Sequence, residues 1–229
     1  FAQQANVKPT ALHLNEALSA GHVAAVDFLV GKRAVLGRSE YLRSASMHKA
    51  AKFGHVAVVK KWIDLGVNAT IPIQGSQAIH VAVNSGHARV VDFLLSQRVS
   101  VHAQGLRGSQ PSHLAALHGH IDVLTSLMEQ RGSVFATNDV GCTPIHLAAA
   151  QGHAEAVRFF LEKGASPSEA SGRGLRPMQI ASLAGHGPVI KLLANHAVHA
   201  SLRPETAATW NTWKVKAIAS IGCALFIFW

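Results

Sequence analysis

Histidine is the residue whose abundance in this chain first suggests chemistry. The 229 residues include fifteen histidines but only twelve Asp and Glu together. A neutral imidazole binds transition metals and acts as a general acid or base near neutral pH. A cluster of histidines with carboxylates or thiolates would therefore indicate a metal site or an enzyme, and the spacing of the histidines decides whether such a cluster exists.

The histidines recur at a fixed period instead of clustering. Six follow a glycine, and these pairs are 32 or 33 residues apart: Gly21-His22, Gly54-His55, Gly86-His87, Gly119-His120, Gly152-His153 and Gly185-His186. Four more lie six residues before such a glycine: His48, His80, His113 and His146. Such a period marks a repeated structural unit. Of the others, His118, His196 and His199 lack partners at the spacing of metal ligands.

Two other patterns could carry chemistry, and both are weak. Cys142 lies four residues before His146, like a nucleophile and its base, but both occupy repeat positions, which favours a structural role. Gly172-Arg173-Gly174 lacks the Gly-Lys and the preceding strand of a phosphate-binding loop. No Gly-x-Ser-x-Gly or His-Glu-x-x-His motif occurs. We therefore predict no catalytic residue, no metal site and no cofactor.

The repeated unit that positions these residues is predicted to be a pair of short helices. In the fifth copy the Thr143 hydroxyl can cap a helix, and Pro144 fits its first position. Gly152 can end this helix in the left-handed conformation, and Gly164 ends a second helix. The residues at helical spacing that we expect to face inward are Ile145, Ala148 and Ala149 and then Val157, Phe160 and Leu161.

This unit resembles the ankyrin repeat, whose pattern is Gly-x-Thr-Pro-Leu-His-x-Ala-Ala-x-x-Gly-His. Residues 141–149, GCTPIHLAA, match it almost residue for residue, and weaker copies read SASMHKAAKFGH, SQAIHVAVNSGH and SQPSHLAALHGH. The resemblance implies an all-α solenoid of stacked helix pairs with hairpin-like finger loops, because one unit alone cannot bury its apolar faces. The predicted units are 8–40, 41–72, 73–105, 106–138, 139–171 and 172–204.

The resemblance also implies roles for individual residues. In ankyrin proteins the repeat histidines hydrogen-bond the backbone between neighbouring loops and helices, and a partner protein is gripped by the fingers and the inner faces of the first helices. The partner-binding residues implied for the inner helices are Lys52, Phe53, Asn84, His118 and Gln151. Those implied for the fingers are Arg38, Arg43, Arg107, Asn138 and Arg173. The alternatives are that the arginines are ordinary solvated charges and that Phe53 packs on the next repeat.

The charge balance favours an acidic partner, an anionic membrane surface or nucleic acid without choosing among them. The net charge is +9 although only 14% of residues are charged, so the excess reflects a shortage of acids more than basic runs. A positive surface attracts acidic proteins, anionic membranes or nucleic acid. Four arginines on the finger edge favour a carboxylate-bearing partner, because guanidinium pairs well with carboxylate. Nucleic acid is the less favoured partner.

Residues 205–229 do not follow the repeat and resemble a membrane anchor. Tryptophans and lysines precede the uncharged stretch AIASIGCALFIFW at 217–229, as at the interface end of a transmembrane helix. That stretch alone would span about 20 Å of a bilayer core of about 30 Å, and a helix start near Thr206 or Trp210 would bring it close to a full span. The alternative is a capping helix on the sixth repeat. The predicted anchoring residues are Trp210, Trp213, Lys214, Lys216, Ile218, Ile221, Leu225, Phe226, Phe228 and Trp229.

Together these patterns predict a non-enzymatic protein-interaction scaffold or accessory subunit of a membrane-bound complex. Two alternatives stay open. The chain could form the N-terminal part of a membrane enzyme similar to ankyrin-containing protein S-acyltransferases, or of a channel, or it could be a soluble regulator. The shortage of acids and the lack of an initiator Met are compatible with import into a mitochondrion or a chloroplast, where the thylakoid is a candidate membrane.

Overall fold

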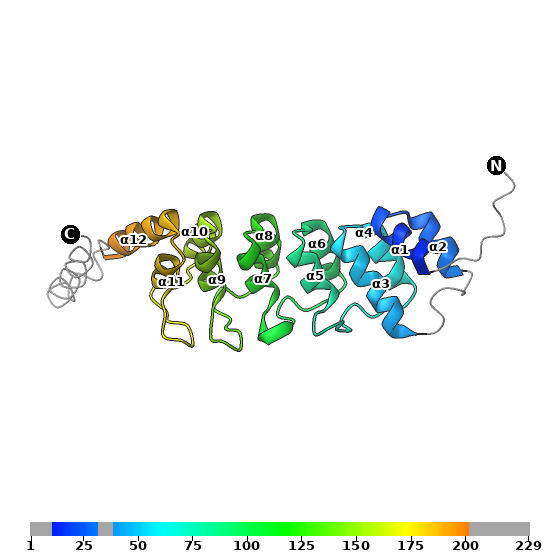
Figure 1. Cartoon of the computed structure of the whole chain (residues 1–229), viewed down its shortest axis with the longest axis horizontal. Coiled ribbons are helices and arrows are strands. Elements are labelled where there is room, and N and C mark those ends of the chain that lie inside the picture. The colour runs from blue at the N-terminus through cyan, green and yellow to red at the C-terminus, as the bar shows by residue number, and fades with distance from the viewer. Residues whose placement is uncertain (1–10, 32–38, 202–229) are drawn as a thin grey trace.

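The computed structural model describes residues 11–31 and 39–201, and these form an elongated row of helix pairs (Figure 1). In that part of the chain the only extended pairing is an isolated bridge between Ile73 and Ser76. The predicted all-α repeat architecture is therefore confirmed over these residues. The predicted anchor at 205–229 lies outside them. None of the described helices is both long enough and apolar enough to cross a membrane.

Twelve α-helices in the described residues make six successive pairs. They are α1 (Ala11–Ala20) with α2 (Val23–Gly31), α3 (Glu40–Lys52) with α4 (Val56–Asp64), α5 (Ala78–Asn84) with α6 (Ala88–Ser96), α7 (Pro111–His118) with α8 (Ile121–Glu129), α9 (Pro144–Gln151) with α10 (Ala154–Glu162), and α11 (Pro177–Leu183) with α12 (Gly187–Ser201). A short 3-10 turn, η1 (Leu106–Gly108), precedes α7. The unit boundaries remain predictions, and α3 begins at Glu40, the last residue assigned to the first unit.

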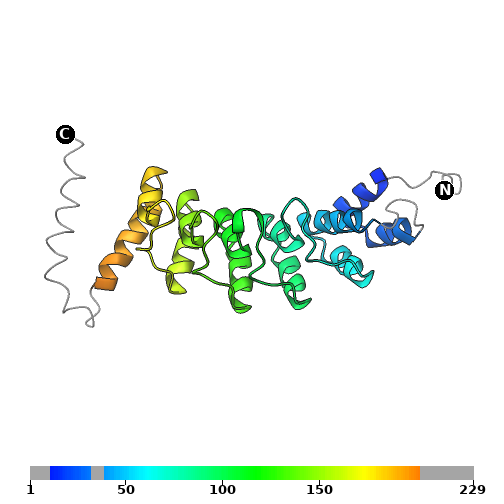
Figure 2. The same cartoon turned by 90° about the horizontal axis from the view of Figure 1, so that it is seen from below.

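The first and second helices of the pairs form two layers. In Figure 1, α3, α5, α7, α9 and α11 line one layer, α4, α6, α8 and α10 line the other, and long finger loops project from the first layer. The view from below in Figure 2 shows the pairs following one another along a single row. A continuous core fills the space between the layers; its largest fully buried side chains include Trp62, Met47, Leu124 and Phe160.

The fifth repeat confirms the local predictions. Thr143 precedes α9 in extended conformation, and Pro144 occupies the first turn. Gly152 ends the helix with φ 76°, and Gly164 follows α10 with φ 88°. The predicted inward residues of both helices are buried: Ile145, Ala148, Ala149, Val157, Phe160 and Leu161.

Arg43 does not lie in a finger, which corrects its predicted position. It lies inside α3, which begins at Glu40 and is capped by Ser39, whose hydroxyl accepts from the Leu42 N–H at 3.4 Å. The second repeat has Ser46 where the fifth repeat has Pro144. A proline there has no N–H and clashes with the preceding turn, so its absence allows the helix to extend toward the N-terminus.

One contact recurs at every junction between repeats, and we call it the Gly-His ladder. The histidine ring of each Gly-His pair, from the second pair onward, lies against the glycine of the preceding pair. Its Nε2–H donates to the carbonyl two residues before that glycine, at 2.8 to 3.3 Å. A Cβ on the glycine would lie 2.5 to 2.9 Å from the ring. The ladder glycines facing a ring are Gly21, Gly54, Gly86, Gly119 and Gly152.

Substitution of one ladder glycine and of the glycine at the same position in the sixth repeat should separate the backbone requirement from the packing requirement. Gly152 and Gly185 share φ 76°, but a Cβ at Gly152 would lie 2.5 Å from His186 Nδ1, whereas no described atom lies within 4 Å of one at Gly185. We expect Gly185→Ala to lower the free energy of unfolding by about 1–2 kcal/mol through the left-handed backbone. Gly152→Ala should cost about 1–3 kcal/mol more because the ring is displaced. Urea denaturation measures both, and equal losses would contradict the packing role.

Candidate protein-interaction surface

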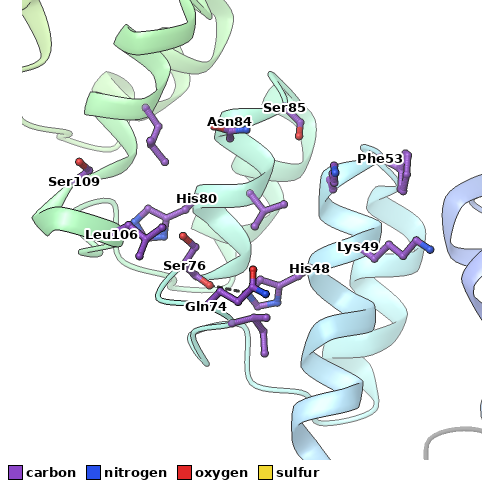
Figure 3. Close-up of a pocket in the computed structure, with 14 residues that line it drawn as sticks. His48, Lys49, Phe53, Gln74, Ser76, His80, Asn84, Ser85, Leu106 and Ser109 are labelled. Atoms are coloured by element: carbon purple, nitrogen blue, oxygen red, sulfur yellow. Dashed lines mark hydrogen bonds between the residues drawn. The ribbon is translucent and has the colours of Figure 1, made fainter. Parts of the chain in front are cut away.

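A groove on the finger side of the second to fourth repeats is the candidate site, and we call it the repeat 2–4 groove. Its cavity volume is about 630 Å³, and its lining comes from α3, α5, α7 and the fingers before α5 and α7 (Figure 3). The apolar part of the lining is Phe53, Ile73, Val81, Leu106 and Leu114. The polar part includes Lys49, Lys52, Asn84, Ser85 and Ser109.

The end of α3 supplies the basic and aromatic side of the groove. Phe53 caps the C-terminus of α3, Lys52 precedes it, and Lys49 lies one turn earlier on the same helix. The Phe53 ring stacks on His55 with centroids 6.4 Å apart and remains 42% exposed. Since His55 belongs to the Gly-His ladder, this aromatic side chain is held by the same residue that joins the first two repeats.

Two fingers supply the opposite side. Ile73 and Ser76 exchange two backbone hydrogen bonds of 2.9 and 3.0 Å around a two-residue turn. Both turn residues are left-handed, with φ 51° at Gln74 and 77° at Gly75. A Cβ at Gly75 would lie 2.7 Å from the Leu106 side chain, so the next finger packs on this turn where only glycine leaves room. Leu106 nevertheless stays 62% exposed.

The histidines under the groove use both ring nitrogens inside the protein. His80 Nδ1 accepts from the Gln77 N–H at 3.2 Å, and Nε2–H donates to the Ala103 carbonyl at 3.0 Å, an arrangement that fits only the neutral ring. In His48, Nδ1 and Nε2 lie 2.7 and 3.0 Å from the Ser44 and Ser76 carbonyl oxygens. These rings are therefore part of the scaffold. In the described part of the chain no group of three His, Cys, Asp or Glu side chains could hold a metal ion.

The His80 arrangement recurs in the next two repeats. His113 and His146 accept from the N–H three residues earlier and donate to a carbonyl of the following loop, Cys142 O and Glu169 O respectively. Burial lowers the pKa of His80, His113 and His146 below its ordinary value. Burial also raises the pKa of the Cys142 thiol. Because both nitrogens of His146 are occupied, its ring is not placed to act as a base for Cys142.

Asn84 presents hydrogen-bond donors to the groove. The exposed His118 donates through Nε2–H to Asn84 Oδ1 at 2.7 Å, so the amide N–H groups of Asn84 stay available to a ligand. His118 also stacks on His120, with centroids 5.7 Å apart. Its pKa is lowered by desolvation and then by the neighbouring His120 and His153. Asn84 and His118 thus form a polar pair across the third and fourth repeats.

The predicted partner-binding residues are only partly gathered here. Lys52, Phe53 and Asn84 line the groove, and Arg107 lies on the finger next to Leu106. Gln151 and Arg173 lie elsewhere, exposed at the end of α9 and on the finger before α11. The side-chain oxygen of Asn138 accepts hydrogen bonds from the Val140 and Cys142 N–H groups. Arg38 is outside the described residues. Sequence reasoning missed Lys49 and Leu106, although Lys49 lies four residues before Phe53.

The stacked helix pairs and the finger loops define an elongated helical repeat protein. A family model described as ankyrin repeats in three copies matches residues 47–139 and again residues 112–204. The chain belongs to the ankyrin-repeat family. No curated protein gives a significant match to the sequence.

Because the buried rings of His80, His113 and His146 are neutral, we predict that acid lowers the free energy of unfolding of the repeat array. The pKa of each of the three buried rings is below 6.5 in the folded chain, whereas the unfolded chain titrates near that value, so the unfolded chain binds protons first. The contribution of these three neutral rings to the free energy of unfolding is complete above about pH 6.5 and is lost as the pH falls through their lowered pKa values. Urea midpoints at about pH 7.5 and pH 5 test this.

The chain offers a matched variant for this test. In the sixth repeat Gln179 stands at the histidine position, and its Oε1 accepts from the Arg176 N–H at 2.9 Å. His113→Gln should therefore keep the hydrogen bond and reduce the loss of stability at low pH. A urea midpoint that does not fall between pH 7.5 and pH 5 would contradict the role assigned to the neutral rings. So would an equal fall of the midpoint in the original chain and in His113→Gln.

Proposed function

We propose that the chain is a non-enzymatic protein-interaction scaffold whose repeat 2–4 groove holds a segment of a partner protein. The observation that carries this proposal is that Phe53 and Leu106, 42% and 62% exposed, line one groove beside lysine and amide donors. Single exposed apolar residues are common on proteins, but apolar side chains gathered in a concave site with a polar rim are typical of binding surfaces. Membership of the ankyrin-repeat family supports a binding role.

Variants of the groove should lose partners. We expect Phe53→Ser combined with Leu106→Ser to reduce the recovery of co-purifying proteins by about tenfold or more, as truncation of central interface residues does. Phe135→Ser is the matched control, because Phe135 is 58% exposed and does not line the groove. Quantitative mass spectrometry of affinity-purified full chain measures the recovery. Equal recovery with both variants, each shown by circular dichroism to stay folded, would contradict the use of this groove.

We further propose that the scaffold is an accessory subunit of a membrane-bound complex, anchored by residues 205–229. The support is the sequence: Trp210, Trp213, Lys214 and Lys216 precede thirteen uncharged residues at 217–229. Tryptophan and lysine at the start of an apolar run favour insertion into a bilayer. An organellar membrane, mitochondrial or thylakoid, is the proposed location, supported by the low acid content.

Alkaline carbonate extraction tests the anchor. Membranes containing the full chain are compared with membranes containing a chain that ends at Pro204. We expect the full chain to stay in the pellet and the shorter chain to be released, because only an integral segment resists extraction. Release of both chains would contradict an integral anchor and would favour the soluble regulator.

A further inference from the structure

We infer that the repeat 2–4 groove takes an acidic segment of a partner protein, one in which an apolar side chain is flanked by Asp or Glu. This inference rests on the proposed function, since it names the chemistry of the segment that the same groove holds. Three features support this inference. They are the placement of carboxylates in the array, the hydrogen-bonding groups at the groove rim, and the apolar side chains between the lysines and the finger before α7.

No Asp or Glu side chain lines the groove. Most acidic residues of the described chain lie on second helices, as with Asp64 of α4, Asp92 of α6 and Asp122 of α8; the others are Glu16 in α1, Glu40 in the first turn of α3, and Asp139 and Glu169 in the fingers before α9 and α11. The sequences of α5, α7, α9 and α11 contain no Asp or Glu, and no Asp or Glu of any other element lines the groove. A partner facing this layer therefore meets no negative charge on those four helices.

The two lysines of the groove are not neutralised within the described residues. Lys49 Nζ donates to the Asn15 side-chain oxygen at 3.1 Å, which is a neutral acceptor. The ion pairs of this part of the chain, Lys61 with Asp27 and Arg158 with Glu155, lie on second helices. Lys49 also lines a hollow together with Asn15 and Glu16 of α1, so its ammonium group lies toward the first repeat. Lys52 is exposed and forms no ion pair there, so a carboxylate of the partner would meet an uncompensated ammonium group.

The polar groups left free at the groove are mainly donors. His48 and His80 use both ring nitrogens on the backbone, and the oxygen of Asn84 already accepts from His118. The free groups are therefore the Lys52 ammonium group, the remaining N–H groups of the Lys49 ammonium and the Asn84 amide N–H groups, together with serine hydroxyls and the Gln74 amide, which also offers an acceptor oxygen. A ligand must supply acceptors to such a rim. Carboxylates are the strongest acceptors that a protein segment offers, because their hydrogen bonds to these donors are charge-assisted.

The apolar lining requires the same segment to carry a large apolar side chain. Phe53 is held from one side by the His55 ring, and Leu106 is held by the Gly75 turn. Both keep exposed surface toward solvent although their positions are fixed by packing. Held aromatic and aliphatic groups lose little conformational freedom on binding, which makes them good anchors. Leu, Ile, Phe or Trp of the partner would cover them.

The charge pattern along the row favours an acidic protein segment over a nucleic acid. The inner-helix positions that hold Lys52 and Phe53 in the second repeat hold Ala150 and Gln151 in the fifth and Leu183 in the sixth. The basic stretch on the inner helices is therefore short and ends in apolar and neutral side chains, and the exposed Arg107 and Arg173 lie on separate fingers. A nucleic-acid strand would need a positive track that follows its phosphates.

Selection of displayed random peptides on the immobilised full chain tests the inference. Peptides of about twelve residues can cross more than one repeat. We expect the recovered peptides to place Asp or Glu beside Leu, Ile, Phe or Trp. Binding should weaken about tenfold in Lys49→Gln with Lys52→Gln and about tenfold in Phe53→Ser. Lys60→Gln, at an exposed lysine of α4, and Phe135→Ser should leave the affinity unchanged. Lys52→Glu should shift the preference toward peptides in which the acid is replaced by Lys.

Three other outcomes would overturn the inference, and they separate it from the proposed function. Neutral or basic peptides that still depend on Phe53 and Leu106 would show that the groove binds protein segments of another chemistry. If no recovered peptide depended on any groove residue, the proposed use of the groove would fail as well. Displacement of the peptides by a single-stranded oligonucleotide that itself loses affinity in the double lysine variant would make nucleic acid the occupant. Melting curves of each variant confirm that it is folded.

Discussion

The contact between a histidine ring and the glycine of the preceding repeat is the constraint on which the array depends. The ring can approach because glycine has no Cβ, and the same glycine adopts the positive φ that ends the first helix. The Nε2–H then reaches a backbone carbonyl such as Lys52 O or Asn84 O. One residue pair thus sets both the end of a helix and the distance to the next helix pair. Its recurrence at 32 or 33 residues follows from that geometry, since each unit must present the same glycine to its neighbour.

A second set of histidines works in the opposite direction along the row. His80, His113 and His146 reach forward to carbonyls of the following loop, whereas the ladder histidines reach back. Each of these rings donates with Nε2–H and accepts with Nδ1, so a neutral imidazole satisfies two buried backbone groups that would otherwise lack partners. The abundance of histidine is explained by this bracing of successive repeats. The repeat histidines first suggested metal or acid–base chemistry, but their ring nitrogens are engaged in hydrogen bonds to the backbone of the scaffold.

The sequence was sufficient to predict the helix pairs, the buried faces and the ends at glycine, because these are set by residues within one repeat. The groove could be predicted only in part. One side of the groove depends on Leu106, in the finger before α7, packing on Gly75, which lies 31 positions earlier in the chain. It also depends on the left-handed backbone of Gln74, a conformation that glutamine does not favour. Arg43 was misplaced because the missing proline at Ser46 allows α3 to begin earlier. Local patterns determine elements, whereas the approach of one finger to another is set by packing.

The ladder also explains how one scaffold can carry different surfaces. It uses the backbone carbonyl of the residue two positions before each glycine and does not use that residue's side chain. The side chains at the five ladder positions are accordingly unlike one another: Ser19, Lys52, Asn84, Leu117 and Ala150. Substitution there changes the chemistry facing a partner without removing a junction hydrogen bond. Lys52 and Asn84 lie at successive junctions, so the basic and donor-rich part of the row is built by side chains whose residues contribute only their backbone carbonyls to the ladder.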